Sequence, residues 1–167
     1  MTTIVRVAAL AGISALLACQ DSSQPGQNPG ARESAWVPDA AATLASEYFS
    51  GFDETTQRVV ASTPEWVTAW AQLYSRVQPK PDVPAVNFLT QRVIVVGLGT
   101  KNSGGYAVRL DSLVTFENGT KVFTTALVPG DRCGVTAALT QPVFAVRVPT
   151  PVEPVTFEQQ TVAQHCE

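Results

Sequence analysis

The stretch "RVIVVGLGTKNSGGYAVRLDSLVTFENGTKVFTTALV", residues 92–128, decides the fold of this chain. Its first part, 92–99, is apolar at nearly every position, which is typical of a strand that is covered on both faces. A polar segment with two adjacent glycines follows. We therefore expect a central strand of a sheet, then a connection to a second strand.

The second part of the stretch predicts a hairpin. Apolar and polar residues alternate over 106–116, a period that indicates a strand with two different faces. The alternation puts one set of residues on one face and the other set on the opposite face: Tyr106, Val108 and Leu110 against Ala107, Arg109 and Asp111. Asn118-Gly119 suits a tight turn, and 121–128 is the predicted return strand.

Segments on both sides of this stretch extend the β pattern. We expect further strands in "LASEYFSGF", "TQRVVAS", "PVFAVRV" and "PVTFEQQTV", which occupy 44–52, 56–62, 142–148 and 154–162. The turns between strands are short, so the predicted architecture is mainly β with one helix (α+β). It is an antiparallel β-sandwich or an open barrel of six to eight strands, formed by residues 36–167, with the helix packed on it.

One amphipathic helix is expected over 64–77. Thr63 can cap its first turn, and Pro64 suits the first helical position. Trp66, Trp70, Leu73 and Val77 form a single apolar stripe, and Pro79 and Pro81 are expected to end the helix. Two tryptophans could also form a ligand platform, but a stripe at this spacing favours burial in the core.

The N-terminal residues predict export. Residues 7–17 are apolar and too few to span a bilayer, which fits a signal peptide over 1–18. "LLAC", residues 16–19, resembles a bacterial lipobox, and this resemblance implies cleavage before Cys19 and lipid attachment to that residue. The alternative is an ordinary secretory signal with an incidental cysteine.

Composition gives the expected location and limits the partners. Residues 19–35 are rich in Gly, Pro, Ser and Gln and are expected to form a disordered tether. Gln20 after the cysteine resembles an outer-membrane sorting pattern, so we expect a lipid-anchored protein of the cell envelope at the outer membrane. The formal net charge is −3, with no basic patch that would suit a nucleic acid.

Two cysteines remain for the folded part if Cys19 carries lipid. An oxidising compartment favours a disulfide between Cys133 and Cys166. Its loop of about 34 residues would contribute roughly 3–4 kcal/mol in the chain-entropy model. The alternative is a metal site with His165 as a third ligand, but the spacing of structural zinc sites is absent, so no metal is expected.

The sequence favours no enzymatic activity and no cofactor. His165 is the only histidine of the chain and lies two residues from its end. A catalytic triad needs a histidine that packing holds in place, and no GxSxG elbow is present. A hydrolase with two carboxylates stays formally open, although no spacing of Asp and Glu supports it.

The loop "GTKNSGG", residues 99–105, is the candidate binding element. Asn102 stands where GxGxxG needs its third glycine, and a strand rather than a helix follows, which excludes both common phosphate-binding loops. We predict an exposed tip, with two glycines setting its backbone and a tyrosine packed at its base. The candidate partner-binding residues are Lys101, Asn102, Ser103, Gly104, Gly105 and Tyr106. The alternative is that the loop only joins two strands.

Several motifs together resemble the C-terminal domain of the PrcB family. They are "GLGTKNSGGYAVRLDSL", the cysteine in "GDRCG", "LTQPVFAVRVP" and the upstream "STPEWVTAWAQLYS". The family motif falls on Gly104, Gly105 and Tyr106 and on Thr140, Gln141 and Pro142.

The resemblance covers the chain from about residue 55 onward. It implies an accessory, protein-binding lipoprotein subunit of a bacterial protease complex, and it supplies no catalytic residues. A chagasin-like protease inhibitor, suggested by loop composition, and an uncharacterised envelope hydrolase are the alternatives.

Overall fold

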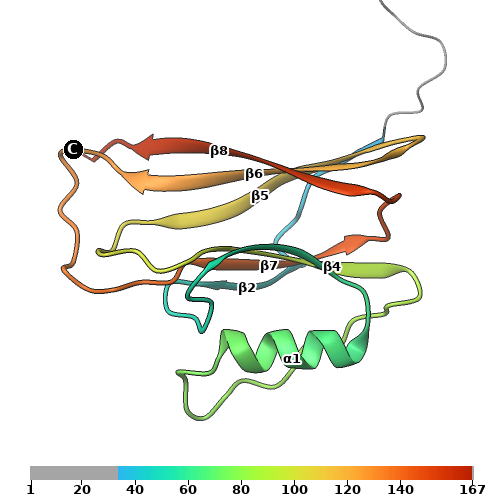
Figure 1. The fold of residues 1–167 in the computed structure, drawn as a ribbon, viewed down its shortest axis with the longest axis horizontal. Helices are drawn as coiled ribbons and strands as arrows, with labels where there is room; N and C mark the ends of the chain where they lie inside the picture. The colour runs from blue at the N-terminus through green and yellow to red at the C-terminus, as the bar shows by residue number, and fades with distance from the viewer. Residues whose placement is uncertain (1–33, 167) are drawn as a thin grey trace, which may run out of the picture. The chain divides into compact units, whose positions relative to one another are not determined.

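The computed structural model describes residues 34–166, which form a β-sandwich with one helix (Figure 1). The predicted signal peptide and Cys19 lie outside these residues. The elements, in chain order, are β1 (Ser34–Trp36), β2 (Thr43–Glu47), β3 (Thr55–Val60), α1 (Thr63–Leu73), β4 (Gln91–Leu98), β5 (Ala107–Phe116), β6 (Gly119–Pro129), β7 (Val143–Pro149) and β8 (Val155–Gln164). The predicted mainly β fold with one helix is confirmed, as a sandwich rather than a barrel.

Each of the two sheets has four strands. One has the order β1-β5-β6-β8 and the other the order β2-β7-β4-β3. All neighbouring strands are antiparallel except β6 and β8, which run parallel over the whole length of β8. The chain crosses to the other sheet in β7 and then returns, which brings β8 to the edge beside β6.

Strand β4 is buried on both faces, as its apolar sequence predicted. Ile94 and Val96 point into the core between the two sheets, whereas Val93 and Val95 point into a second core beneath α1. All four side chains are fully buried. The helix therefore covers the outer face of the β2-β7-β4-β3 sheet and makes a third layer (Figure 1).

The helix begins one residue earlier than expected and ends four residues earlier. Ser62, rather than Thr63, caps it, because the Ser62 hydroxyl accepts the N–H of Glu65 at 3.4 Å. At the other end the N–H of Gly51 donates to the carbonyl of Leu73 at 3.3 Å. A neighbouring loop thus satisfies the last turn, and the helix ends well before the prolines.

The two tryptophans of the helix are core residues, as expected. The rings of Trp66 and Trp70 lie 5.1 Å apart edge to face. Their indole N–H groups donate to the carbonyls of Pro84 and Pro81, each at 2.9 Å. These bonds satisfy the polar atoms of two buried aromatic side chains and hold the 78–90 segment against the helix.

A bulge in β5 interrupts the predicted alternation. The register with β6 shifts between Leu110 and Ser112, which leaves Asp111 as the extra residue. Beyond this point the inward face passes to Leu113, which is buried like Val108 and Leu110. The expected alternation therefore holds only as far as Leu110.

The chain enters the sandwich at one end of the sheet. Ser34 and Ala35, which the sequence placed in the tether, pair with Thr115 and Val114 of β5. Trp36 packs against the core between the sheets, and its burial holds this short strand in place. Within residues 34–166, no helix has the length and apolar character that crossing a bilayer requires.

Candidate functional site

The loop between β4 and β5 is held by backbone bonds to the segment that precedes β7. Lys101 and Thr140 exchange two of them: the N–H of each donates to the carbonyl of the other, at 2.8 and 3.0 Å. The Thr140 hydroxyl donates to the carbonyl of Ser103 at 2.8 Å, and the N–H of Gly104 donates to the carbonyl of Thr136 at 2.9 Å. The β4–β5 loop and the segment that precedes β7 are therefore packed against each other at this end of the sandwich.

This packing changes which loop residues are accessible. Asn102 and Gly105 are exposed, but Lys101 and Ser103 are only partly exposed and Gly104 is buried. The expected free tip of three residues is thus reduced, because the segment that contains Thr136 closes over the loop.

Glycine is required in this loop for two different reasons. Gly105 has a φ of +82°, a conformation that side chains disfavour. A Cβ atom on Gly104 would lie 2.5 Å from the Thr136 hydroxyl oxygen. The two glycines therefore allow a left-handed turn and a close approach, as the sequence suggested.

Tyr106 lies at the base of the loop and packs against the core between the sheets. The Lys101 ammonium nitrogen is 5.9 Å from the centre of the Tyr106 ring. A cation at this distance from an aromatic face is attracted to it. The partly exposed lysine is therefore positioned by a residue that is itself anchored in the core.

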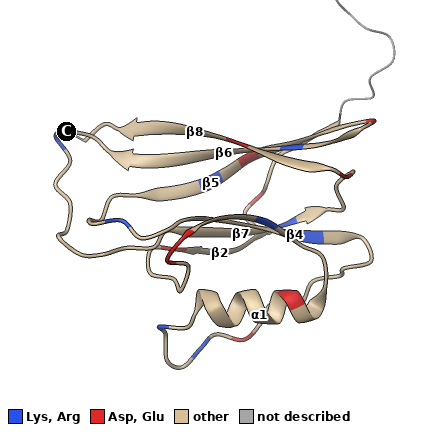
Figure 2. Cartoon of the chain, in the orientation of Figure 1, with Lys and Arg blue, Asp and Glu red and all other residues tan. Residues whose placement is uncertain are grey.

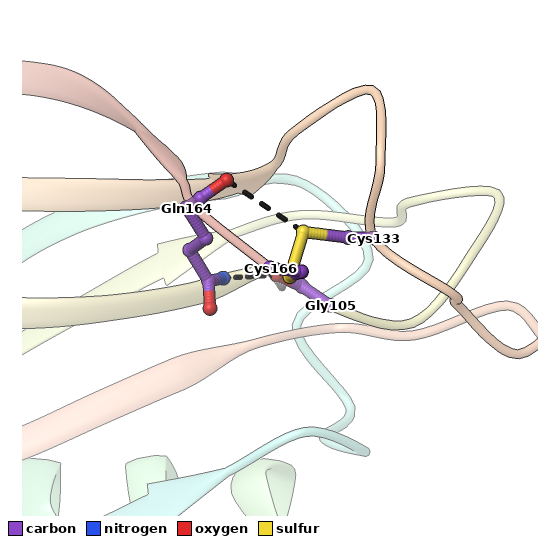
Figure 3. The surroundings of a disulfide bond; sticks show 4 residues. All are labelled: Gly105, Cys133, Gln164 and Cys166. Atoms are coloured by element: carbon purple, nitrogen blue, oxygen red, sulfur yellow. Dashed lines mark hydrogen bonds between the residues drawn. A yellow bond between two sulfur atoms is a disulfide. The ribbon is translucent and has the colours of Figure 1, made fainter.

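A disulfide ties the end of β8 to the same group of loops (Figure 3). The sulfur atoms of Cys133 and Cys166 lie at bonding distance, which is the pairing that the sequence predicted. The side-chain amide of Gln164 donates to the carbonyl of Gly105 at 2.5 Å. The disulfide and this hydrogen bond connect β8, the β4–β5 loop and the segment after β6.

The residues of the second family motif are structural. Thr140 and Gln141 are 2% and 4% exposed. The N–H of Gln141 donates to the carbonyl of Tyr48 at 2.8 Å, and the hydroxyl of Ser50 donates to the carbonyl of Gln141 at 2.9 Å. The segment thus lies between the β2–β3 loop on one side and the β4–β5 loop on the other.

Four exposed apolar side chains at this end, Val135 among them, were not singled out from the sequence, and three of them are more than half exposed. Tyr48 is 57% exposed, Phe49 56% and Leu139 63%. The sequence carries no local signal for this exposure, because Tyr48 and Phe49 lie in a bend after β2 whose position depends on the distant Gln141. We call this end of the sandwich, formed by residues 48–53, 99–106 and 130–142 with the disulfide, the loop end.

The buried Tyr74 holds Glu47, the residue that directly precedes Tyr48 and Phe49. The hydroxyl of Tyr74 donates to Glu47 Oε1 at 2.9 Å. Burial, together with this hydrogen bond and the negative charge of Glu47, raises the pKa of Tyr74 to about 12. The interaction links the C-terminal end of α1 to the last residue of β2.

The charges of the molecule are dispersed rather than gathered at one place. Figure 2 shows acidic and basic residues on both sheets and one acidic residue on the helix, which is Glu65. Several form exposed pairs, such as Arg76 with Asp53 at 2.7 Å and Lys121 with Glu158 at 2.6 Å. Exposed pairs of this kind contribute little to stability and give the loop end no single sign of charge.

The sequence singled out His165 and the carboxylates as the side chains that a catalytic or metal centre would need. His165 is exposed beside the disulfide. Within residues 34–166, no three side chains of His, Cys, Asp or Glu are grouped as metal ligands would be.

A groove of about 520 Å³ lies between β3 and α1, lined in part by Arg58, Glu65 and Thr68.

Comparison with known families finds a match for the central part of the chain. Residues 92–149 match the family model described as PrcB C-terminal, which confirms the resemblance inferred from the motifs. The match covers about a third of the chain and contains β5, β6, β7 and all but the first residue of β4. It includes two segments of the loop end, 99–106 and 130–142, but not 48–53. Comparisons with curated proteins and with solved structures gave no match.

Proposed function

We propose that this chain is a non-catalytic lipoprotein of the cell envelope whose β-sandwich binds another protein, as an accessory subunit of a protease complex. The observation that carries the proposal is the match of residues 92–149 to the PrcB C-terminal domain, which suggests a subunit associated with such a complex. The lipobox at Cys19 supports attachment to the outer membrane through lipid.

The geometry of the loop end supports a contact surface there. The backbone that carries Tyr48 and Phe49 is held in place, because the carbonyl of Tyr48 accepts the N–H of Gln141 and Ser50 directly after the pair is fully buried and bonded to Gln141. Aromatic side chains have only two χ angles, so they lose little conformational entropy on binding and are frequent anchors at protein interfaces. Asn102 adds an exposed polar group on the β4–β5 loop. The proposed contact residues are Tyr48, Phe49, Lys101, Asn102 and Leu139.

The position of the loop end also supports this role. The chain enters the sandwich beside Thr115, near the β5–β6 turn, whereas the loop end lies at the opposite end of the strands (Figure 1). A tether attached at Ser34 would therefore join the sandwich at the end opposite to the loop end and leave the loop end open to a partner.

The proposal is tested by affinity purification of the full chain from native membranes. We expect replacement of both Lys101 and Asn102 by alanine, combined with Phe49→Ala, to reduce the recovered partner. Leu89→Ala is the matched control, because Leu89 is 91% exposed and lies just before β4, at the other end of that strand. Recovery of the partner at wild-type levels with the triple variant would exclude the loop end as the contact.

The activity of the recovered complex distinguishes the accessory role from its alternative. An accessory subunit should raise or preserve the activity of a co-purified protease when it is added back. A chagasin-like inhibitor should lower this activity in proportion to the amount of chain added. Hydrolysis by the purified chain alone would contradict the non-catalytic role.

A further inference from the structure

Strand β8 is an edge strand that contributes little to the core. It pairs with β6 on one side, and in the described part of the chain no strand lies on its other side. Only Val155 and Phe157 pack against the core between the sheets, and every side chain from Glu158 to Ala163 is exposed. The strand is therefore held mainly by its backbone pairing with β6 and by the disulfide after it.

The register identifies the backbone groups on the open side. In a parallel pair, successive residues direct their N–H and C=O groups alternately toward the partner strand and away from it. The N–H of Thr120 donates to the carbonyl of Pro154 at 3.0 Å, and Thr120 is in register with Val155. Even-numbered residues of β8 therefore face β6, and odd-numbered residues face outward.

The outward groups form a regular row. The N–H of Val155 is already satisfied by Glu153 Oε2 at 3.1 Å. The remaining outward N–H and C=O groups belong to Phe157, Gln159, Thr161 and Ala163. They recur every second residue, a spacing that another extended backbone matches.

The features that usually protect an edge strand from pairing are missing from β8. Edge strands are commonly blunted by proline, lysine, bulges or short length. The sequence "VTFEQQTVAQ" contains neither proline nor lysine, and its ten-residue register with β6 has no shift. Its one charged residue, Glu158, is paired with Lys121 of its own sheet. The disulfide at Cys166 keeps this edge ordered in advance.

We propose that the open edge of β8 binds an extended segment of the partner protein by strand addition. The segment pairs with the N–H and C=O groups of Phe157, Gln159, Thr161 and Ala163 and carries no proline at its pairing positions. The uncharged glutamine and threonine side chains that flank the row favour a segment of low charge. This inference rests on the proposed function that the chain binds a protein.

A second copy of this chain is the alternative occupant, because its own β8 edge is also extended and of low charge. Two β8 edges paired antiparallel would run in opposite directions. Their Ser34 residues would then lie at opposite ends of the pair, about 33 Å apart along ten residues of strand. The predicted tethers of residues 19–35 would bridge this separation, so anchoring at one membrane does not decide between the two occupants. The proposed function favours a segment of the partner, and hydrogen exchange in the isolated chain distinguishes the two.

A pair of substitutions at one position separates the backbone from the side chain. Thr161→Pro removes an outward N–H and leaves the bonds to β6 in place, a position where an edge strand tolerates proline. Thr161→Ala removes the side chain and keeps the N–H. Val162→Pro removes a bond to β6 and serves as the reference for damage to the fold. In thermal unfolding, the midpoint temperature of Thr161→Pro should lie near that of the wild type, and the midpoint of Val162→Pro should be lower.

The binding test uses the full chain and its partner recovered from native membranes. We expect Thr161→Pro to reduce recovery about tenfold, because it removes a hydrogen bond and obstructs the paired backbone, and Thr161→Ala to leave recovery unchanged. Hydrogen exchange on the wild-type complex should slow at the amides of Phe157, Gln159, Thr161 and Ala163 relative to the free chain.

Each other result overturns the inference and points to a different cause. Equal recovery by Thr161→Pro and the wild type, or unchanged exchange at the four amides, excludes the β8 edge and leaves the proposed function standing. Slowed exchange in the isolated chain as its concentration rises would identify a second copy as the occupant. Failure of the wild type to recover any protein would overturn the proposed function and this inference with it.

Discussion

Gly105 is a residue of the β4–β5 loop whose replacement should be costly. Its φ of +82° disfavours any side chain, and a Cβ atom there would lie 2.8 Å from Val135 Cγ1. We expect Gly105→Val to lower the free energy of unfolding by about 1 kcal/mol or more. Urea unfolding measures this change, with the exposed Asn102→Ala as a control that should stay within about 0.5 kcal/mol of the wild type. An unchanged Gly105→Val midpoint would contradict the left-handed conformation.

Tyr74 gives the stability of the protein a dependence on alkaline pH. Its pKa is about 12 in the folded protein, above the ordinary value of 10.0 in the unfolded chain. The stabilisation is therefore complete below pH 10 and is lost as the pH rises toward 12, because the unfolded state releases the proton first. Denaturant unfolding across this range should show the decline, and Tyr74→Phe should make it shallower. An equal slope in both proteins would contradict the assignment.

Individual residues were predictable where one physical constraint dominated. The Trp66 and Trp70 stripe had to be buried, and the cysteine pair followed from the few cysteines available. The exposure of Tyr48 and Phe49 was not predictable, because it depends on the hydrogen bond between Gln141 and Tyr48, which lie far apart in the sequence. The partial burial of Lys101 has the same origin in its pairing with Thr140.

At the scale of elements, the N-terminus of α1 tests which residue is the cap. The Ser62 hydroxyl accepts the N–H of Glu65, and Glu65 in turn accepts the N–H of Ala61 at 2.9 Å. Ser62→Ala should therefore destabilise the protein by about 1 kcal/mol, whereas Thr63→Ala should have a smaller effect. Thermal unfolding of the two variants compares them directly. A larger loss for Thr63→Ala would restore the cap that the sequence suggested.

The disulfide should matter most for β8. This strand buries few side chains, so the covalent link to Cys133 supplies much of its attachment. Replacing Cys133 and Cys166 together by alanine should cost roughly 3–4 kcal/mol in the chain-entropy model. Chemical unfolding gives the loss, and hydrogen exchange should show it first in the second half of β8. The reduced wild type should behave like the double variant, and a difference between them would point to the alanines themselves.

Element positions were predictable to a greater extent than element partners. Alternation and turn residues located the β5–β6 hairpin, because its pairing is local. The parallel pairing of β6 with β8 was not predictable, since β7 intervenes in the chain and joins the other sheet. The early end of α1 likewise depends on Gly51, which belongs to a distant loop.

At the scale of the whole molecule, the proposed anchor determines how the sandwich is presented. Cys19→Ala should release the protein from the membrane fraction and abolish labelling by a lipid precursor, because several acyl chains are needed for stable attachment. Fractionation and labelling of the same cells measure both effects. The variant should keep the thermal stability of the folded domain, and labelling that persisted in it would contradict lipid attachment at this residue.

The two burial faces of β4 make the domain a single cooperative unit. Val93 and Val95 belong to the core beneath the helix, and Ile94 and Val96 belong to the core between the sheets. Detachment of the helix would expose the buried outer face of β4, and withdrawal of β4 would open both cores, so we expect the two layers to unfold in one transition. A destabilising substitution in either layer should therefore lower the midpoint of one common unfolding transition. A variant that leaves the loop end unchanged can for this reason still reduce the amount of folded chain that reaches its partner.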